Sequence, residues 1–554
     1  MSVQDSFYNP TDEKRHEMLY QSLNRLGRTE DYENIIELLS PTPDISEFAS
    51  PMSLRNLNIG IIGAGLAGLS AAYELKKLGA GITIFDAEGK RIGGRIYTHY
   101  FNNSRQYFGE FGAMRIPVSH ETTWHYINLF NLNTESLSSP ESNNFIYAHN
   151  VRMRRDRNGQ NIQEFLYPLY NLTESERNTP WDELVDYATN TMMYSLTPEQ
   201  RSEILKILPT YSDEYASITK ISNRQVYETL GLSQGFINLL SAVDPFAGDA
   251  LNISHDETMS ENYSLDFLNT YRIHEGMINL PMAFINSLTN NNIQRLSNRS
   301  GQTGKVNIKL GHIVNGISQV SDNYVNLHYS TPGGDELTES FDFVICAIPF
   351  STLRDIELNP YFRNQKMQAI KELSYIDAQK TICLFNKRFW EEDAPYGNVN
   401  GGISFTDLII QSIVYQPDHI RCENADCSYT EPGVLIASYN LGQDAVRLSN
   451  QNPFRRFEIV KRDVEKVHGT PDGYLDTLID SSKTVHWNAE QWTRGGFAAG
   501  YPGQKVNFAY PMLLPEYNDR VFFAGEHIST KPGWMQGSLQ TGKWAANQIA
   551  LFAR

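Results

Sequence analysis

Cysteine is scarce in this chain. Four cysteines occur among 554 residues, too few for a disulfide scaffold in a chain of this length. Cys346 and Cys383 lie in apolar runs, which is typical of thiols in a protein core. Cys422 and Cys427 lie in a polar stretch with no second cysteine pair or histidine pair nearby. The sequence therefore predicts no structural zinc, and we expect no metal site.

Long hydrophobic runs are also missing. No stretch approaches the roughly 18 consecutive apolar residues of a membrane-spanning helix. The first twenty residues carry charges throughout and lack the apolar segment of a secretory signal. We therefore expect no membrane partner and a cytoplasmic location, although a chain trimmed of its leader would look the same.

Basic residues are fewer than acidic residues in this chain. Lys and Arg total 47 against 64 Asp and Glu, a net charge of −17, and no basic run offers the phosphate-neutralising surface that nucleic-acid binding requires. We expect no nucleic acid as a partner. With 40% hydrophobic and 20% charged residues, the composition is that of a globular chain of several domain-sized units.

A strand–helix–strand pattern opens the first domain. Residues 58–63 form a short apolar run typical of a buried strand, and residues 66–78 carry apolar positions at helical spacing. Residues 82–85 form a second strand pattern. This βαβ unit predicts a parallel sheet.

The rest of the chain alternates between helical and strand patterns. Helical patterns dominate residues 120–265, and strand patterns return at residues 305–350, with Gly333-Gly334 as a hairpin turn. A final helix is predicted over residues 537–552. We find no internal repeat.

Gly63-Ala-Gly65-Leu-Ala-Gly68 lies between the first strand and its helix. Glycines at this spacing let the backbone approach a pyrophosphate at the positive helix N-terminus. Asp86 ends the second strand, 18 residues beyond Gly68, where a ribose-binding carboxylate is expected. Together these residues predict dinucleotide binding.

The next motif narrows the cofactor. Arg91-Ile-Gly93-Gly94-Arg95 resembles the extended fingerprint of the flavin-dependent amine oxidase family. In that family the glycine pair lies against the FAD diphosphate and the second arginine helps to hold it. The resemblance therefore implies FAD rather than NAD.

The C-terminal segment resembles the closing motif of the same family. In Gly525-Glu526-His527 the glutamate is expected to bind the flavin ribityl chain, and the helix after Gly533-Trp534-Met535 is expected to point its N-terminus at the flavin ring. No cysteine follows Cys427, so the cysteinyl flavin bond of some relatives is excluded in this segment. We expect non-covalent FAD. The resemblance adds a further set of cofactor contacts, namely Gly112, Ala113, Met114, Arg115, Val314 and Trp534.

One segment points to a branch of the family. Gly109-Glu-Phe-Gly112-Ala-Met-Arg115-Ile-Pro117 resembles the Gly-x-Met-Arg motif of L-amino-acid oxidases, whose arginine binds the substrate carboxylate. A planar guanidinium matches a carboxylate with two parallel hydrogen bonds. A structural ion pair with Glu110 or another acid is the alternative role of Arg115.

Three more residues complete the predicted substrate site. Tyr439 resembles the tyrosine that donates a second hydrogen bond to the substrate carboxylate. Gly533 and Trp534 match the pair whose glycine carbonyl accepts from the substrate amine and whose tryptophan walls the pocket. Simple packing is the alternative for both aromatic residues.

Lys380 is the predicted catalytic residue. It lies among apolar residues in Ala378-Gln-Lys380-Thr-Ile-Cys-Leu-Phe, a strand pattern. It resembles the family lysine that holds a water beside flavin N5 and aids reoxidation by dioxygen. The alternative is a surface lysine whose aliphatic stem lies along the protein.

The resemblance covers residues 56–554 and implies the fold class. We expect a mixed α/β and α+β protein, with a Rossmann-type FAD-binding domain, a mixed-sheet substrate domain and a helical insertion. The predicted division is 1–55 N-terminal arm packing on the substrate domain; 56–105, 266–370 and 496–554 FAD-binding domain; 106–140 and 371–495 substrate domain; 141–265 helical domain.

The implied activity is oxidation of an L-amino acid by dioxygen to the 2-oxo acid, ammonia and hydrogen peroxide. An L-amino-acid 2-monooxygenase is the first alternative, because Gly-Ala-Met-Arg followed by Pro117 and the segment Tyr501-Pro-Gly503 also resemble that branch. An amine or polyamine oxidase and a non-catalytic flavin-binding protein are further alternatives. A homodimer is expected by analogy alone. Three residues are candidates for contact with the side chain of the amino-acid substrate, although packing or solvated roles are favoured for each: Glu261, Asp266 and Trp390.

Overall fold

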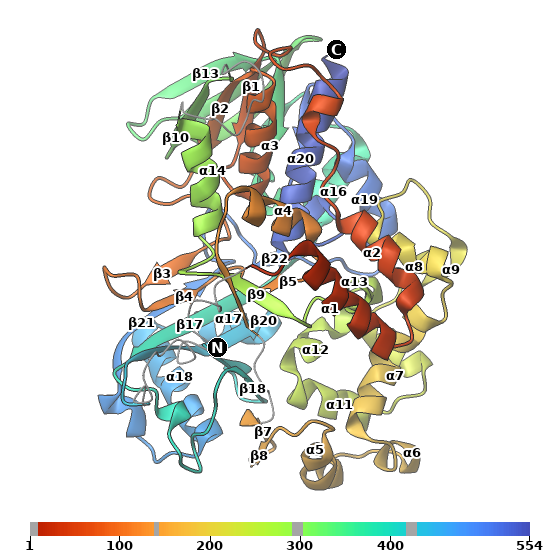
Figure 1. The fold of residues 1–554 in the computed structure, drawn as a ribbon, viewed down its shortest axis with the longest axis vertical. Helices are drawn as coiled ribbons and strands as arrows, with labels where there is room; N and C mark the ends of the chain where they lie inside the picture. Colours follow the sequence, from red (N-terminus) through yellow and green to blue (C-terminus); the bar gives the residue numbers. More distant parts are fainter. Residues whose placement is uncertain (1–8, 138–142, 291–302, 417–428, 554) are drawn as a thin grey trace.

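The computed structural model describes residues 9–137, 143–290, 303–416 and 429–553. Cys422 and Cys427, for which we predict no zinc site, lie outside these ranges. A parallel sheet with its helices occupies one end of the molecule, and a larger mixed sheet lies beside a group of helices at the other (Figure 1).

The parallel sheet is the one predicted from the βαβ pattern. Its five strands are ordered β10-β2-β1-β14-β23, and every neighbouring pair is parallel. The helix α3 (Leu66–Lys77) connects β1 to β2. The strands are β1 Asn58–Ile62, β2 Gly81–Asp86, β10 Val306–Leu310, β14 Phe343–Cys346 and β23 Val521–Phe523.

Both faces of this sheet are covered, as parallel sheets require. Helices α3 and α20 (Met535–Phe552) lie on one face and pack closely, because a Cβ on Gly542 would approach the Ala67 carbonyl to 2.2 Å. On the other face Gly60 leaves space for Leu327 and Phe341 of a second sheet, ordered β13-β12-β11-β15. Its strands are β11 Ile313–Ser321, β12 Tyr324–Ser330, β13 Glu336–Phe341 and β15 Glu357–Asn359.

The larger sheet has seven strands in the order β21-β17-β20-β19-β18-β7-β8 and is mixed, because β18 and β7 run parallel while the other neighbours are antiparallel. Helices α17 (Gly442–Ser449) and α18 (Pro453–His468) pack on it. The strands are β7 Phe145–Ala148, β8 Val151–Arg154, β17 Ala378–Phe385, β18 Gly402–Thr406, β19 Ser412–Tyr415, β20 Gly433–Leu441 and β21 Ile479–His486.

The hairpin β7–β8 lies within a region where the sequence pattern favours helix. Its strand character depends on partners far along the chain. Ser404 Oγ accepts a hydrogen bond from the Phe145 N–H at 2.8 Å, and the Asn144 side chain donates to the Gly401 carbonyl at 2.9 Å. Four-residue strands leave too short a pattern to be read from the sequence.

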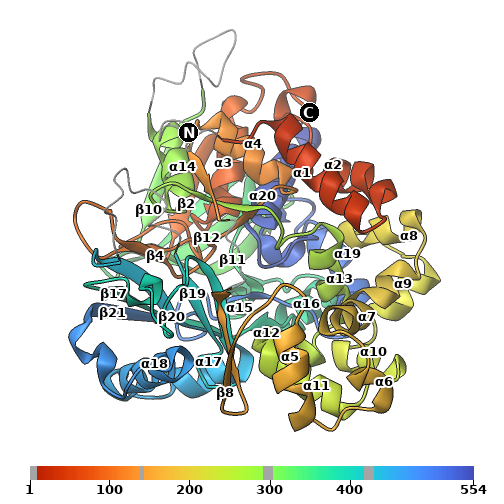
Figure 2. The ribbon, with the colours of Figure 1, turned by 60° about the horizontal axis from the view of Figure 1, so that its bottom comes forward.

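Helices fill the region between residues 160 and 263, as the sequence predicts, and gather on one side of the molecule (Figure 2). They are α5 Gln160–Phe165, α6 Glu174–Arg177, α7 Trp181–Tyr194, α8 Pro198–Ser202, α9 Asp213–Ile218, α10 Asn223–Thr229, α11 Gln234–Val243, α12 Pro245–Asp249 and α13 His255–Tyr263. Among the described residues, no helix combines the length and the apolar character needed to cross a membrane.

The N-terminal arm contains two helices, α1 (Asp12–Arg25) and α2 (Tyr32–Leu39). Their apolar side chains share one cluster with Val118 and with residues of the helical region such as Met193 and Met259. Buried Asp31 accepts from Arg201 at 2.9 Å, which ties the arm to α8. The division into domains remains a prediction.

Short elements connect these layers. They are β3 Thr98–Tyr100, β4 Phe108–Glu110, β5 Ile116–Pro117, β6 Thr134–Ser136, β9 Thr270–Ile273, β16 Tyr375–Ile376, β22 Phe497–Ala498, α4 Glu121–Leu129, α14 Asn279–Thr289, α15 Phe350–Leu353, α16 Asn364–Glu372 and α19 Gln504–Leu513.

Candidate active site

A cavity of about 1550 Å³ runs between the two sheets and the helices, and is called the central cavity below. It extends from the ends of β1 and β2 at Gly63 and Asp86 to Lys380 on β17 and Tyr439 on β20, and reaches Glu261 on α13. Ordinary small-molecule pockets measure about 300 to 1,000 Å³. The central cavity therefore has room for a dinucleotide and a substrate together.

The structure brings nearly all predicted site residues to this cavity. The lining includes every predicted cofactor-contacting and substrate-contacting residue except Gly68. A Cβ on Gly68 would lie 2.0 Å from the Gly63 carbonyl oxygen. Gly68 is thus needed for the close approach of α3 to β1.

The glycine loop presents the N-terminus of α3 to the cavity. Gly65 is the N-cap of α3 and supplies no side-chain cap, so the first N–H groups and the positive end of the helix dipole are available to an anion. A Cβ on Gly65 would meet nothing within 4 Å, whereas Gly63 has φ +105° and its Cβ would meet the Ala347 carbonyl at 2.8 Å. The loop is open at Gly65, which is called the open cradle below, and its backbone is constrained at Gly63.

Asp86 is held by the backbone around it. Its carboxylate accepts from the Ala64 N–H at 2.6 Å and from the Glu88 N–H at 2.8 Å. Burial raises its pKa, against the opposing effect of these two hydrogen bonds. Asp86 therefore braces the glycine loop, and its contact with a ribose remains a prediction. Glu88, which the sequence analysis did not single out, also lines the cavity.

Arg95 and Glu526 form an ion pair on the cavity wall. Arg95 Nη1 lies 2.6 Å from Glu526 Oε1, and Glu526 also accepts from the Gly533 N–H at 2.8 Å. Burial alone would raise the pKa of Glu526, but Arg95, His527 and the Gly533 N–H outweigh it and the pKa is lowered. Arg95 is predicted to hold the FAD diphosphate and Glu526 the adjacent ribityl chain, and the two residues stabilise each other as ions.

The second helix N-terminus also meets the cavity. Helix α20 begins at Met535, two residues before its predicted start. Trp534 is its N-cap, and Gly537 lies within its first turn. A Cβ on Gly537 would lie 2.0 Å from Ser529 Oγ. Since no side chain caps this end, its positive dipole is available to an electron-rich group.

The segment from Gly112 to Arg115 lies on the cavity wall. A Cβ on Gly112 would lie 1.6 Å from the Arg95 carbonyl oxygen, so only glycine fits there. Arg115 is partly buried and lines the cavity, and its Cζ lies 5.9 Å from the Phe267 ring. The Phe267 ring also lies 5.7 Å from the Trp534 ring, so Arg115 and Trp534 have a common neighbour.

Lys380 is buried, with 3% of its surface exposed. Its Nζ donates to the carbonyls of Gly112 at 2.9 Å and Glu110 at 3.1 Å, and lies 4.5 Å from the Tyr439 ring. Burial lowers the pKa of Lys380 to about 7, against the opposing effect of Glu110. The structure thus excludes the surface lysine considered as the alternative.

Tyr439 and Trp534 are the two aromatic residues of the predicted substrate site, and both line the cavity. Tyr439 packs against Phe246 at 5.0 Å between ring centroids. Burial raises the pKa of its hydroxyl while Arg115 acts in the opposite direction, so the phenol is a hydrogen-bond donor at neutral pH. The Trp534 ring lies 5.0 Å from His120 and 5.7 Å from Phe267.

The three residues considered for contact with the substrate side chain lie in different surroundings. Glu261 lines the cavity. Asp266 is buried in an ion pair with Lys531 at 2.8 Å and meets His120 at 3.1 Å, and Trp390 packs in the core beneath β17 and β20. Asp244 and Glu257 are cavity acids that the sequence analysis missed. The i, i+4 spacing of Glu257 and Glu261 on one helix face could have indicated Glu257, whereas no local pattern indicates Asp244.

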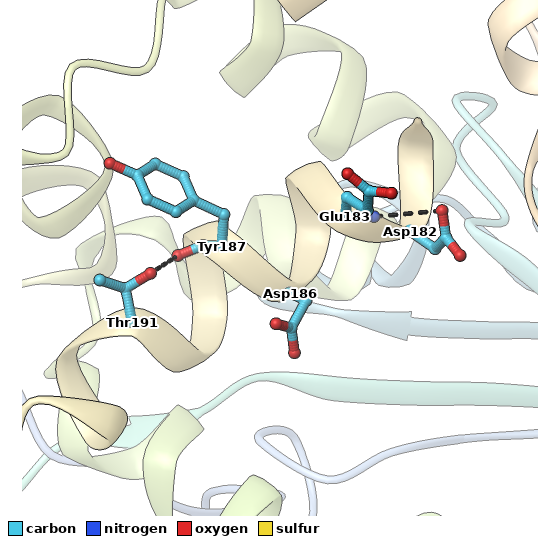
Figure 3. A pocket seen from close by; sticks show the side chains of 5 residues that line it. All are labelled: Asp182, Glu183, Asp186, Tyr187 and Thr191. Carbon is cyan, nitrogen blue, oxygen red and sulfur yellow. Dashed lines mark hydrogen bonds between the residues drawn. The ribbon is translucent and has the colours of Figure 1, made fainter. Parts of the chain in front are cut away.

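A second hollow of about 470 Å³ lies on the exposed side of α7 (Figure 3). Its lining residues are Asp182, Glu183, Asp186, Tyr187 and Thr191. The hydrogen bonds drawn there stay within α7: Thr191 donates to the Tyr187 carbonyl at 2.6 Å, and Asp182 accepts from the Glu183 N–H at 3.1 Å. We assign no chemistry to this hollow.

The parallel sheet with its glycine loop shares one cavity with the seven-stranded sheet, an arrangement suited to a dinucleotide and a substrate. The chain belongs to the flavin containing amine oxidoreductase family, whose model matches residues 66–550. It is therefore a flavin-dependent amine oxidoreductase, and the family implies FAD.

Individual relatives are distant but extend over the full chain. The L-amino-acid oxidase of Vipera ammodytes ammodytes is 26% identical over 540 residues, covering 95% of this chain and 98% of that protein. The protein YobN of Bacillus subtilis (strain 168) is 29% identical over 497 residues, covering 89% and 94%.

Solved structures share the fold. Putrescine oxidase with bound putrescine superposes with a TM-score of 0.67 at 16% identity, over 90% of this chain and 99% of that one. Cyclohexylamine oxidase from Brevibacterium oxydans IH-35A gives a TM-score of 0.65 at 17% identity, over 89% and 98%. The predicted fold class is confirmed.

The cavity residues fit FAD. The open cradle at Gly65, the Arg95–Glu526 pair and the two uncapped helix N-termini supply groups suited to a diphosphate, a ribityl chain and an electron-rich ring. When bound, FAD accepts a hydride from the carbon that bears the substrate amine.

We expect the flavin to be dissociable. Both cysteines in the described residues, Cys346 and Cys383, lie in the hydrophobic core and not on the cavity wall. Acid precipitation of the holoenzyme should leave all FAD in the supernatant, as measured by absorbance and chromatography. A pellet that stays yellow after washing would contradict this prediction.

Proposed function

We propose that this protein is an L-amino-acid oxidase that converts its substrate to the 2-oxo acid, ammonia and hydrogen peroxide. The observation that carries the proposal is Arg115, a partly buried guanidinium on the wall of the same cavity as Lys380 and Tyr439. A cation at this place suits a substrate that carries a carboxylate. The names of the full-length relatives support the same choice.

The proposed binding mode uses both ends of the amino acid. Arg115 binds the carboxylate with two parallel hydrogen bonds, and the Tyr439 hydroxyl donates a third. The Gly533 carbonyl accepts from the amine, and Trp534 limits the rotation of the substrate. Most of the rate gain then comes from holding the α-carbon hydrogen in one orientation.

An anaerobic screen tests the proposal. Each of the twenty L-amino acids, and the amine that each gives on decarboxylation, is mixed with the holoenzyme without oxygen, and loss of the flavin absorbance is recorded. We expect at least one L-amino acid to bleach the flavin and its amine to fail. Bleaching by amines alone would refute the proposal and favour an amine oxidase.

A product assay separates the oxidase from the monooxygenase. With oxygen present, we expect one 2-oxo acid, one ammonia and one hydrogen peroxide for each amino acid consumed. Release of carbon dioxide with formation of an amide would instead identify the 2-monooxygenase activity. A protein that binds FAD but stays oxidised with every compound would have no catalytic role.

Lys380 is expected to act in the reaction with dioxygen. Replacement Lys380→Met should slow that half-reaction by about 10²-fold, because a buried ammonium stabilises the negative charge that develops on dioxygen. Because burial lowers the pKa of Lys380 to about 7, the wild-type rate constant should fall as pH rises through that value, and the variant should show no such step.

The measurement is stopped-flow mixing of pre-reduced enzyme with oxygen at several concentrations and pH values. The anaerobic reduction of the flavin by substrate serves as the internal control and should change much less. An equal loss in both half-reactions would show that Lys380 has only a structural role.

A further inference from the structure

Glu261 lies beside the segment that is proposed to receive the substrate amine. Burial raises the pKa of its carboxyl, and the neighbouring Trp534 indole opposes that shift. Helix α13 is fixed to this segment by Lys531, whose Nζ donates to the Ser260 carbonyl at 2.6 Å, and by Ser260 Oγ, which donates to the Thr530 carbonyl at 3.3 Å. The carboxyl is thus held on the cavity wall next to Gly533 and Trp534.

Arg115 and Glu261 both line the cavity, and both act on Tyr439. Arg115 lowers the pKa of the Tyr439 hydroxyl and Glu261 raises it. Phe267 and Trp534 link the two, since the Phe267 ring is 5.9 Å from the Arg115 guanidinium and 5.7 Å from the Trp534 ring. The wall therefore offers a cation to one end of a zwitterion and an anion to the other.

We propose that Glu261 binds the substrate ammonium and takes its proton, so that the amino acid is oxidised as the neutral amine. This step rests on the proposed function. One N–H bond breaks, its electron pair stays on nitrogen, and the proton forms an O–H bond with the carboxylate. No electron is gained or lost in this transfer, and the proton returns to solvent once the product has left.

Burial and the groups around Glu261 together set its pKa. Burial and the neighbouring carboxylates Asp266 and Asp244 raise its pKa, Lys531 and the Trp534 indole oppose them, and the result is about 7. Glu257, one turn away on α13, is coupled to it electrostatically. A proton acceptor works best when its pKa lies near the working pH.

Asp266 shows what a structural carboxylate in the same region looks like. It accepts from Lys531 and Ser264 and meets His120, and it does not line the cavity. Burial would raise its pKa, but Lys531 and His120 lower it to about 2. Glu261 differs in both respects, because it lines the cavity and its pKa is raised rather than lowered.

The test compares the wild type with Glu261→Gln, which keeps the shape of the side chain and removes its basicity. The rate of anaerobic flavin reduction at saturating substrate is measured from about pH 6 to pH 9.5. The wild-type rate should rise and level off above the pKa of Glu261. The variant should be about 10²-fold slower at pH 7 and should recover about tenfold per pH unit, as free amine replaces ammonium.

Two further variants exclude structural explanations. Glu261→Asp keeps a carboxyl and should retain the levelling profile at a lower rate. Glu183→Gln makes the same chemical change on the exposed face of α7 and should match the wild type throughout. Parallel profiles for Glu261→Gln and wild type, whether equal or offset by a constant factor, would overturn the inference.

The experiment separates this inference from the proposed function. The substrate used is whichever compound bleaches the wild type. If only amines do so, the proposed function fails and the Glu261 comparison is made with that amine. If an L-amino acid bleaches the wild type and the profiles are parallel, the inference fails alone. If nothing bleaches it, both fail.

Discussion

Replacing Arg115 with alanine is expected to remove at least ~2 to 3 kcal/mol of transition-state stabilisation for the L-amino-acid substrate. This corresponds to a fall in kcat/KM of roughly 30- to 150-fold. The loss follows because the substrate carboxylate would enter the cavity without its charge-assisted partner. Steady-state kinetics of peroxide release measure the effect. An unchanged kcat/KM would refute the role of Arg115.

Arg115→Lys is the matched control for charge. It keeps a cation but removes the planar fork, so we expect part of the loss to remain. The decarboxylated amine provides the complementary control, because it lacks the group that Arg115 binds. Any slow oxidation of that amine should be unaffected or improved by Arg115→Ala. A parallel loss for both compounds would indicate damage to the fold.

Gly112→Ala is expected to remove most of the bound FAD. The new Cβ would lie 1.6 Å from the Arg95 carbonyl oxygen, which is backbone and cannot rotate away. Relief requires the turn that contains Arg95 or the 112–115 segment to move, and Arg95 is the partner of Glu526 at 2.6 Å. Overpacking of this kind costs about 1 to 3 kcal/mol, so FAD affinity should fall about tenfold to a hundredfold.

The measurement is the ratio of flavin to protein absorbance after gel filtration, with circular dichroism to confirm folding. Gly333→Ala is the control, because its Cβ would meet nothing closer than 3.6 Å in an exposed hairpin turn. Normal FAD content in a folded Gly112→Ala protein would show that this backbone contact does not shape the cofactor site.

The elements that the sequence predicts well are those set by nearby residues. The βαβ unit and its glycine loop depend on apolar spacing and on glycines within about 30 residues. The segment ending at Arg115 is likewise a contiguous motif. These parts appear in the structure at their expected places, and helix α20 differs from its predicted start by only two residues.

The parts that the sequence did not predict depend on distant partners. The hairpin β7–β8 exists because β18, about 260 residues further along, supplies a neighbouring strand. The alternation of residues 145–154 is too short to outweigh the helical pattern around it.

The sequence by itself predicted a dinucleotide-binding fold, a flavin fingerprint and an arginine proposed to bind a carboxylate, because each is carried by contiguous residues whose spacing fixes their geometry. Only the tertiary structure decided what the acidic residues do. Glu261 and Asp266 are five positions apart and equally acidic in sequence, yet Lys531 and His120 neutralise one while the other faces the cavity. That difference arises from the way α13 packs against the segment before α20, which no local pattern encodes.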